Sequence, residues 1–154
     1  MLEKKGEWKR KHAGGIVALA ILALLVLAFA VSFLTGNGKK AGTKEDRIDF
    51  LASLGWQADP ESEEADSVRI PACGEGAMAD YNALMQKGGY DLSKYEGKTV
   101  EQYRYRLTNY PDCEQTVWVT LYVWRGRVIG GDIHTAALDG FMHELRPNDE
   151  KPTG

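Results

Sequence analysis

The sequence predicts an α+β protein, in which an N-terminal transmembrane helix precedes a small domain of two helices packed on a three- to four-stranded antiparallel meander. Three observations lead to this fold class. One early run is apolar on every side, and two later segments place apolar residues at helical spacing. The chain after residue 99 alternates between apolar and polar residues, as strands do. We expect both helices to pack against one face of the sheet.

The early apolar run covers residues 16–34, IVALAILALLVLAFAVSFL, with Ser32 as its only polar residue. A helix of this length covers nearly the ~30 Å hydrocarbon core of a bilayer, and a small domain cannot bury a helix that is apolar all round. The alternative is a signal peptide, because residues 28–30 have the small-x-small cleavage pattern and cleavage near Ala30 would release a secreted protein. The length of the run, and the sticky N-terminus that cleavage would leave at residues 31–34, favour a retained anchor.

Basic residues on both sides of this run predict its orientation. Five precede it within residues 1–15, and three follow it soon after: Lys4, Lys5, Lys9, Arg10, Lys11, then Lys39, Lys40 and Lys44. Because Lys and Arg accumulate on the cytoplasmic side of a membrane span, we predict a cytoplasmic N-terminus and a single-pass protein of the cell membrane. The domain would then lie outside the cytoplasm.

The remaining boundaries follow from composition. Residues 35–43, rich in Gly and Lys, predict a flexible linker, and residues 147–154 predict a disordered tail. The extracytoplasmic domain then covers residues 44–146. From Lys44 onward the chain has 12 Lys and Arg against 20 Asp and Glu, a balance of −8. Such a domain repels phosphate backbones, so we expect no nucleic-acid partner.

The chain has two cysteines, Cys73 and Cys113. Outside the cytoplasm they could form a disulfide worth about 3–4 kcal/mol of stability. The equally weighted alternative is a pair of free thiols.

A first helix is predicted over residues 44–54, because Thr43 can cap it, with Asp46 completing an imperfect capping box. The acidic stretch 59–66 lacks the ligand spacing of an EF-hand and predicts a solvated loop, followed by a short strand over residues 67–70. A second helix has its apolar stripe between residues 77 and 85 and ends at Gly88-Gly89.

Three stronger strand signals follow, over residues 100–110, 116–124 and 127–134. The middle one is apolar on both faces and is therefore expected at the centre of the sheet. A two-residue turn, Arg125-Gly126, joins the last two strands as a hairpin, since glycine accepts the positive φ that such turns require.

The hairpin leaves two registers open. An unbroken ladder places Val119 opposite Asp132, with His134 two residues further along the same apolar face. A bulge at Gly130-Gly131 would instead send both polar side chains to the other face.

That other face carries an aromatic row, and its exposure decides whether it is a binding surface. Trp118, Tyr122 and Trp124 share it, and with Asp132 and His134 they form the candidate binding surface. The simpler alternative is that helices cover these rings, either together or one on each side of the sheet.

The sequence offers little for catalysis or metal binding. It has no HExxH, CxxC or GxSxG motif, and neither cysteine has a histidine neighbour in the sequence. We therefore expect no catalytic residue, no metal, no cofactor and no enzymatic activity. The alternative is a cell-envelope enzyme or metal-binding module centred on Asp132, His134 and His143.

Four segments in this order carry a family resemblance: RIDFLASLGW, VRIP, DYNALMQKGGYDLSKYEGKTVEQYRYRLTNYP and RVIGGDIHTAALDGFMHEL. Together they cover residues 47–145, and they resemble the bacterial domain of unknown function family 4830. The resemblance implies a membrane-anchored extracytoplasmic domain of the bacterial cell envelope, and it supplies no catalytic residues. We thus expect a small non-enzymatic domain for interaction or ligand binding. Its partners would be the bilayer, through residues 16–34, and another envelope or membrane protein or a small ligand.

Overall fold

The structure is a computed structural model that describes residues 39–137 and 139–148. The predicted cytoplasmic segment 1–15 and the predicted transmembrane helix 16–34 lie outside the described residues. No helix within the described ranges is both long enough and apolar enough to cross a membrane.

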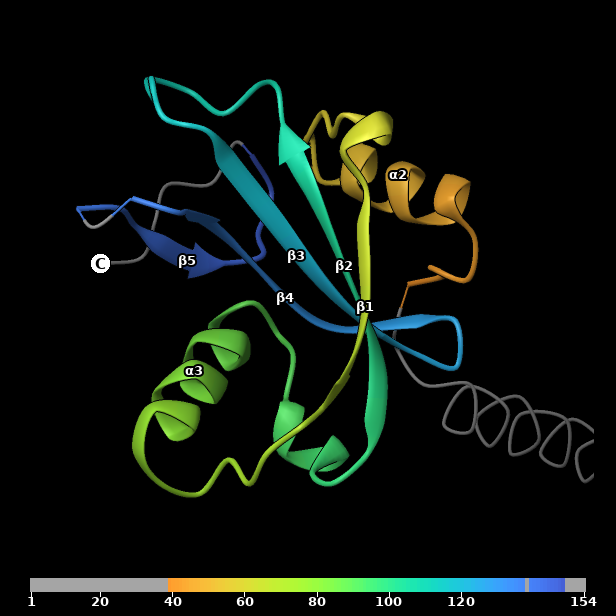
Figure 1. Ribbon diagram of the computed structural model, residues 1–154, viewed down its shortest axis with the longest axis vertical. Helices are drawn as coiled ribbons and strands as arrows, with labels where there is room; N and C mark the ends of the chain where they lie inside the picture. The colour runs from red at the N-terminus through yellow and green to blue at the C-terminus, as the bar shows by residue number, and fades with distance from the viewer. Residues whose placement is uncertain (1–38, 138, 149–154) are drawn as a thin grey trace, which may run out of the picture. The chain divides into compact units, whose positions relative to one another are not determined.

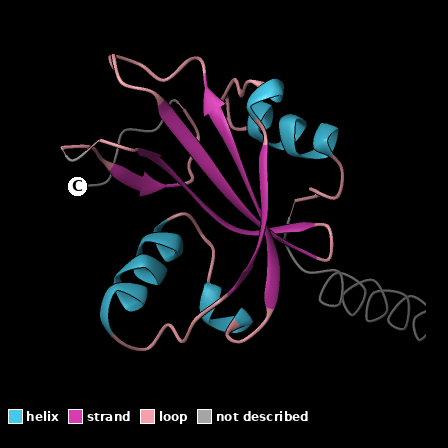
Figure 2. Ribbon diagram, viewed as in Figure 1, coloured by secondary structure: helices cyan, strands magenta, loops and turns pink. Residues whose placement is uncertain are grey.

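The described domain has the predicted α+β architecture, with two α-helices and one antiparallel sheet (Figures 1 and 2). Short 3-10 helices, labelled η, lie between them. In chain order the elements are α2 (Lys44–Ser53), η1 (Pro60–Ser62), β1 (Glu64–Arg69), α3 (Gly76–Lys87), η2 (Leu92–Tyr95), β2 (Thr99–Leu107), β3 (Val117–Trp124), β4 (Arg127–Thr135) and β5 (Met142–Glu144).

The sheet is a meander, as predicted, but it has five strands instead of three or four. Its order is β1-β2-β3-β4-β5, and every neighbouring pair is antiparallel. The strand that the sequence prediction missed is β5, whose three residues are too few to show an alternating pattern. It pairs with the end of β4 and forms one edge of the sheet.

The two helices lie on opposite faces of the sheet, so the prediction that both pack on one face is wrong (Figure 1). Phe50 and Leu51 of α2 join the core cluster that contains the valines of β3. Met85 of α3 joins a second cluster, against which Tyr122 and Trp124 pack. The physical reason is that β3 is apolar on both faces, and each face requires its own cover.

The start of α2 follows the sequence prediction. Thr43 accepts a hydrogen bond from the backbone N–H of Asp46, whose carboxylate accepts one from the N–H of Thr43, and this completes the capping box. The sequence did not reveal that Arg47 is buried in this helix. Its guanidinium donates to Glu63 at 2.8 Å and to the hydroxyl of Tyr105 at 2.8 Å, which ties α2 to the sheet.

The acidic stretch 59–66 is only partly the loop that its composition predicts. It forms η1 and then the first half of β1, where Glu64 pairs with Arg104 of β2. β1 is an edge strand whose side chains are mostly exposed. Acidic residues are compatible with such an edge because they stay solvated and discourage pairing with another chain.

The folded domain extends beyond its predicted limits at both ends. Ala41, assigned above to the flexible linker 35–43, is fully buried and donates its backbone N–H to Gly126 at 2.9 Å. Asn148, assigned to the disordered tail, donates its backbone N–H to Leu54 at 2.8 Å.

The two cysteines are free thiols, so the disulfide considered from the sequence is not formed. Cys73 is buried in the α3-side cluster, while Cys113 packs against the α2-side cluster. The sheet lies between them.

A substitution at Gly131 can test how closely β4 packs against β3. A Cβ at this position would lie 2.5 Å from the backbone oxygen of Thr120, so the strands would have to shift. We predict that Gly131→Ala lowers the free energy of unfolding by about 1–3 kcal/mol, as overpacked cores do. Gly74→Ala, with no atom within 4 Å of its new Cβ, is the control, and it should change stability by less than about 0.5 kcal/mol. Urea denaturation measures both, and equal effects would contradict the strand spacing described here.

Candidate functional site

A β-bulge in β4 determines which side chains reach the α3 face of the sheet. Val123 pairs with Val128, whereas Tyr122 pairs with Gly130, so Ile129 is an extra residue between them. The unbroken register is therefore wrong and the bulged alternative is confirmed, with the extra residue immediately before the two glycines. Thr120 now lies opposite Asp132. The shift places Asp132 and His134 on the same face as the aromatic row.

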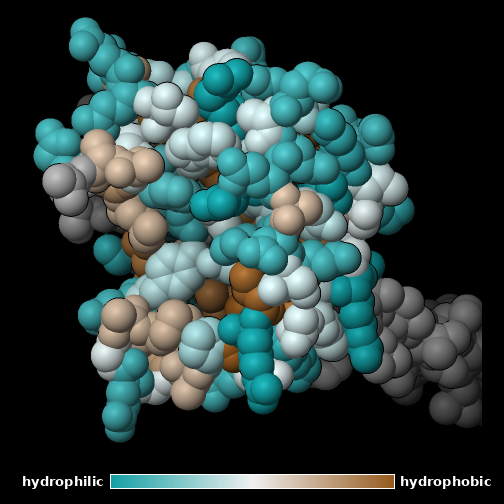
Figure 3. Space-filling model, in the orientation of Figure 1, coloured by the Kyte–Doolittle hydropathy of each residue, from teal (hydrophilic) through white to brown (hydrophobic). Residues whose placement is uncertain are grey.

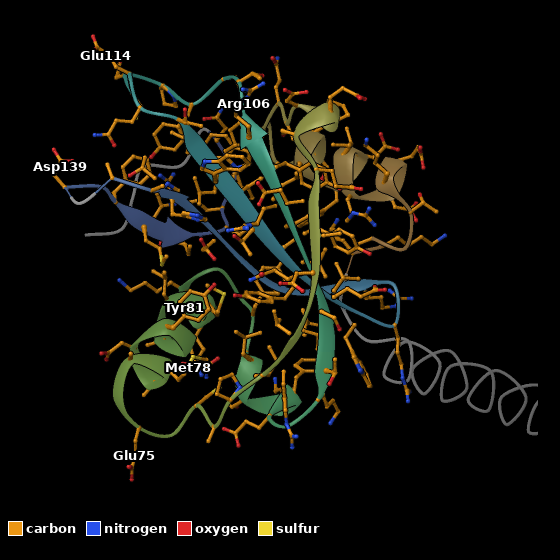
Figure 4. All side chains as sticks on the ribbon, viewed as in Figure 1. Glu75, Met78, Tyr81, Arg106, Glu114 and Asp139 are labelled. Atoms are coloured by element: carbon orange, nitrogen blue, oxygen red, sulfur yellow. The ribbon has the colours of Figure 1, made fainter. Side chains whose placement is uncertain are left out.

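Asp132 is buried, with 2% of its surface exposed, and its carboxylate is held on both sides. Oδ1 lies 2.7 Å from Nδ1 of His134, and Oδ2 accepts a hydrogen bond from the hydroxyl of Tyr81. Tyr81 comes from α3, so the pair links the helix to β4; Figure 4 shows its ring on the side of α3 toward β5. Burial, and then the Asp132 charge, raise the pKa of Tyr81 well above its ordinary value, which keeps it a proton donor.

The hydrogen-bond chain continues from Tyr81 into the sheet. Its hydroxyl lies 3.2 Å from that of Tyr122, which in turn accepts a hydrogen bond from the side-chain amide of Gln102 at 3.1 Å. Because Tyr81 has one proton and gives it to Asp132, we assign the Tyr122 hydroxyl as the donor between the two tyrosines. The chain then runs in one direction, from Gln102 to the buried carboxylate.

His134 is the end of this network that reaches solvent. Because a carboxylate only accepts hydrogen bonds, the contact with Asp132 assigns the single proton of the neutral ring to Nδ1, and Nε2 of that neutral ring then has the lone pair. The His134 side chain is 19% exposed. The network thus presents an oriented imidazole at the surface.

His134 belongs to a row of four cross-strand neighbours, which we call the exposed row: Arg106, Trp118, His134 and Met142. Among the described residues, Met142 is the one large hydrophobic side chain that is exposed, at 50%. Trp118 is partly exposed, and it belongs to neither core cluster. Arg106 pairs with Asp59 and lies near the end of β2 (Figure 4).

The other two aromatic residues of the predicted surface are half-buried like Trp118, but they pack against the α3-side cluster. Tyr122 packs edge-on against Tyr81 of α3, with ring centroids 6.3 Å apart. Trp124 packs against Tyr95 of η2, at 5.4 Å. The three rings therefore do not form one open surface: Tyr122 and Trp124 pack against the α3-side cluster, whereas Trp118 belongs to neither cluster and lies beside His134. In the view of Figure 3 the surface is mostly hydrophilic, and apolar side chains gather in a recess beside α3.

His143 does not join Asp132 and His134. It pairs with Ile133, which lies in the α2-side core, so its ring is on the opposite face of the sheet. There it stacks on Phe141, with ring centroids 5.6 Å apart and planes at 10°. Its Nδ1 lies 2.8 Å from the carbonyl oxygen of Glu144, and Nε2 lies 3.0 Å from the hydroxyl of Tyr110. Both nitrogens are occupied by structural hydrogen bonds.

No group of three or more His, Cys, Asp and Glu side chains in the described parts of the chain is placed to hold a metal ion. The zinc type of site, which uses these ligands, is therefore not formed by them. The residues that sequence reasoning missed are Tyr81, Arg106 and Met142. In the sequence, Tyr81 looks like an ordinary core residue of an amphipathic helix. Arg106 and Met142 lie beside the site only because of how the strands pair, which the sequence does not show.

A family model described as "Domain of unknown function (DUF4830)" matches residues 50–133, which is more than half of the 154-residue chain. The match includes Tyr81, Trp118 and Asp132 and ends just before His134. No curated protein and no solved structure matches the chain.

Tyr81→Phe tests whether the buried carboxylate depends on its tyrosine donor. Removing the hydroxyl leaves one oxygen of Asp132 without its partner, so we expect a loss of about 1–3 kcal/mol in the free energy of unfolding. Tyr95→Phe is a matched control, because the structure gives the Tyr95 hydroxyl no hydrogen bond within the described residues. It should change stability by less than about 0.5 kcal/mol. Equal stability of the two variants in urea denaturation would argue against the network.

His143 predicts a pH dependence of stability. Burial, followed by the nearby Arg146 charge, lowers the pKa of His143 below its ordinary value. The unfolded chain, with a histidine pKa near ~6.5, then binds the proton more readily than the folded chain. Stability is therefore present above about pH 6.5 and is lost as the pH falls from there toward the folded-state pKa. His143→Gln should flatten this slope.

Urea midpoints at pH 8 and about pH 5.5 measure this slope in both proteins. At that lower pH most paired carboxylates are still ionised, so their contribution is small. The same slope in His143→Gln and in the unmodified chain would show that the buried ring is not responsible.

Proposed function

The chain belongs to the family described as "Domain of unknown function (DUF4830)", and from the chemistry of its own residues we propose that it is a non-enzymatic binding domain. In this proposal residues 16–34 anchor it in the cell membrane, with the N-terminus in the cytoplasm and the domain outside. Support for the anchor comes from the apolar run and from the basic residues before it. The binding partner is a small ligand or a segment of another envelope protein.

The observation that carries the proposal is the oriented imidazole of His134. Burying a carboxylate costs free energy, and Asp132 is almost fully buried. A sheet that needed only stability could place an apolar residue there, as β4 does at Ile133. The arrangement instead fixes Nδ1 of His134 and leaves Nε2 without a hydrogen bond in the described part of the chain, on a side chain that is 19% exposed. A surface that recognises a ligand benefits from such fixed geometry, because less freedom is lost on binding.

The neighbours of His134 add contact area to this polar group. Trp118 offers a flat, partly exposed ring, and Met142 offers a flexible, polarisable side chain. Tryptophan and arginine are enriched among the residues that dominate binding energy, and methionine adapts to different partners. The exposed row combines these groups on four adjacent strands.

The enzymatic alternative has weaker support. An Asp–His pair can act as a general base, but only with a nucleophile or substrate group within reach. The version centred on Asp132, His134 and His143 needs the three side chains to converge, and His143 is on the other face of the sheet. We therefore propose binding without catalysis.

Hydroxyl-radical footprinting tests the proposal without knowledge of the ligand. The full chain is oxidised in the membranes of the cells that produce it and, in parallel, after purification and dialysis against a chelator. Binding at the exposed row predicts several-fold slower oxidation of Met142 and Trp118 in the membranes than in the purified protein, because a bound ligand covers them. Mass spectrometry of the peptides gives the rates.

Met78 and Trp124 are the internal controls, since both pack against the α3-side core and outside the exposed row. Their oxidation rates should be the same in both preparations. Equal rates for Met142 and Trp118 as well would mean that nothing occupies the row in the cell, and would contradict the proposed function.

A further inference from the structure

We infer that the exposed row is a binding site for a soft monovalent metal ion, Cu(I), held by Nε2 of His134 and the thioether sulfur of Met142 and covered by the ring of Trp118. This inference rests on the proposed function, since it names the ligand of the same surface. It goes beyond the zinc type of site considered above, because its second ligand is a thioether.

The two proposed ligands are direct neighbours across β4 and β5. His134 pairs with Met142 in the strand register, so both side chains leave the sheet on the same face. The Cβ atoms of such a pair are about 4.5–5.5 Å apart, within reach of one ion for two side chains of this length. Met142 is also half exposed, which is unusual for a methionine that serves only as core filling.

Asp132 prepares His134 for this role. Metal-bound histidines commonly donate their other ring N–H to a carboxylate, which fixes the tautomer and makes the free nitrogen a better ligand. The 2.7 Å contact between Nδ1 of His134 and Oδ1 of Asp132 has this geometry. Because Tyr81 and His134 occupy its oxygens, Asp132 supports the ligand and does not contact the ion.

Trp118 supplies a third contact of a different kind. It is the β3 neighbour of His134, on the side away from Met142. Its side chain leaves the same face of the sheet, and its ring is long enough to reach across His134 toward an ion bound at Nε2. The face of a tryptophan ring attracts cations, and the attraction grows when water is excluded. The nearby Arg106 does not cancel this attraction, because its own charge is paired with Asp59.

The donor set selects the ion. One imidazole and one thioether are neutral ligands, and thioether sulfur favours Cu(I) over hard cations. Zinc requires three or four ligands, which the described His, Cys, Asp and Glu side chains do not assemble. A monovalent d¹⁰ ion accepts a low coordination number, and it needs no carboxylate to balance its charge.

The test uses the purified full chain carrying Cys113→Ser, so that the partly exposed thiol of Cys113 does not take up the ion. Its methionines are labelled with ¹³C in the methyl group, and one equivalent of Cu(I) is added and kept reduced by ascorbate without oxygen. We expect the Met142 methyl resonance, assigned by its loss in Met142→Leu, to shift. The resonances of Met78 and Met85 should not move, because both methionines pack in the α3-side cluster. One equivalent of Zn(II) should leave the Met142 resonance in place.

Affinities are then measured by competition with the Cu(I) chelator bicinchoninate. They are measured in Cys113→Ser, because the partly exposed thiol of Cys113 competes for Cu(I). Met142→Leu and His134→Gln should each weaken binding at least about tenfold, and Asp132→Asn should weaken it by about 10–100-fold. Met78→Leu removes a thioether elsewhere and should leave the affinity unchanged.

The inference is overturned if the Met142 methyl does not move at one equivalent of Cu(I), or if Met142→Leu binds as tightly as its parent. If Cu(I) does not bind but Trp118 and Met142 are protected in the footprinting experiment, the surface binds a different ligand and the proposed function holds. If there is neither Cu(I) binding nor protection, the proposed function is contradicted as well.

Discussion

The single extra residue in β4, Ile129, is the constraint on which the rest of the site depends. It shifts the pairing so that Tyr122 meets Gly130 and Val123 meets Val128. Because side chains alternate between the faces of a strand, this one residue moves Asp132 and His134 from the valine face to the face of α3. Without it, the carboxylate of Asp132 would lie in the α2-side core, on the opposite face of the sheet from Tyr81.

The bulge and α3 support each other. Gly130 leaves room for Leu92 of η2 and Met85 of α3, whose Cδ2 and Sδ would lie 2.9 Å and 3.4 Å from an added Cβ. Tyr81, one turn before Met85 on α3, donates to Asp132. A buried carboxylate is tolerated only when it is well hydrogen-bonded. The packing of α3 against the sheet and the orientation of His134 are therefore energetically coupled, because both depend on Asp132. This coupling explains how a small domain keeps a polar network close to its core.

Local signals were sufficient to predict much of the fold. The Thr43 cap, the Arg125-Gly126 turn and the alternation in β2 and β3 each depend on a few adjacent residues, and all are observed. The failures concern long-range pairing. Helices on both faces, the strand β5 and the burial of Arg47 depend on contacts between segments far apart in the sequence. The same distinction holds for the site. Asp132 and His134 could be proposed as site residues from the sequence, whereas Tyr81 and Met142 could be assigned to the site only after helix packing and strand register were known.

The most direct test of the account is the tautomer of His134, observed by long-range ¹H–¹⁵N NMR of the full chain with its imidazole neutral. The hydrogen bond from Nδ1 to Asp132 predicts that Nδ1 carries the proton and that Nε2 has the chemical shift of an unprotonated nitrogen. Asp132→Asn should remove this preference. A ring protonated at Nε2 in the unmodified chain would contradict the account, because the imidazole would then have no lone pair to present at the exposed row.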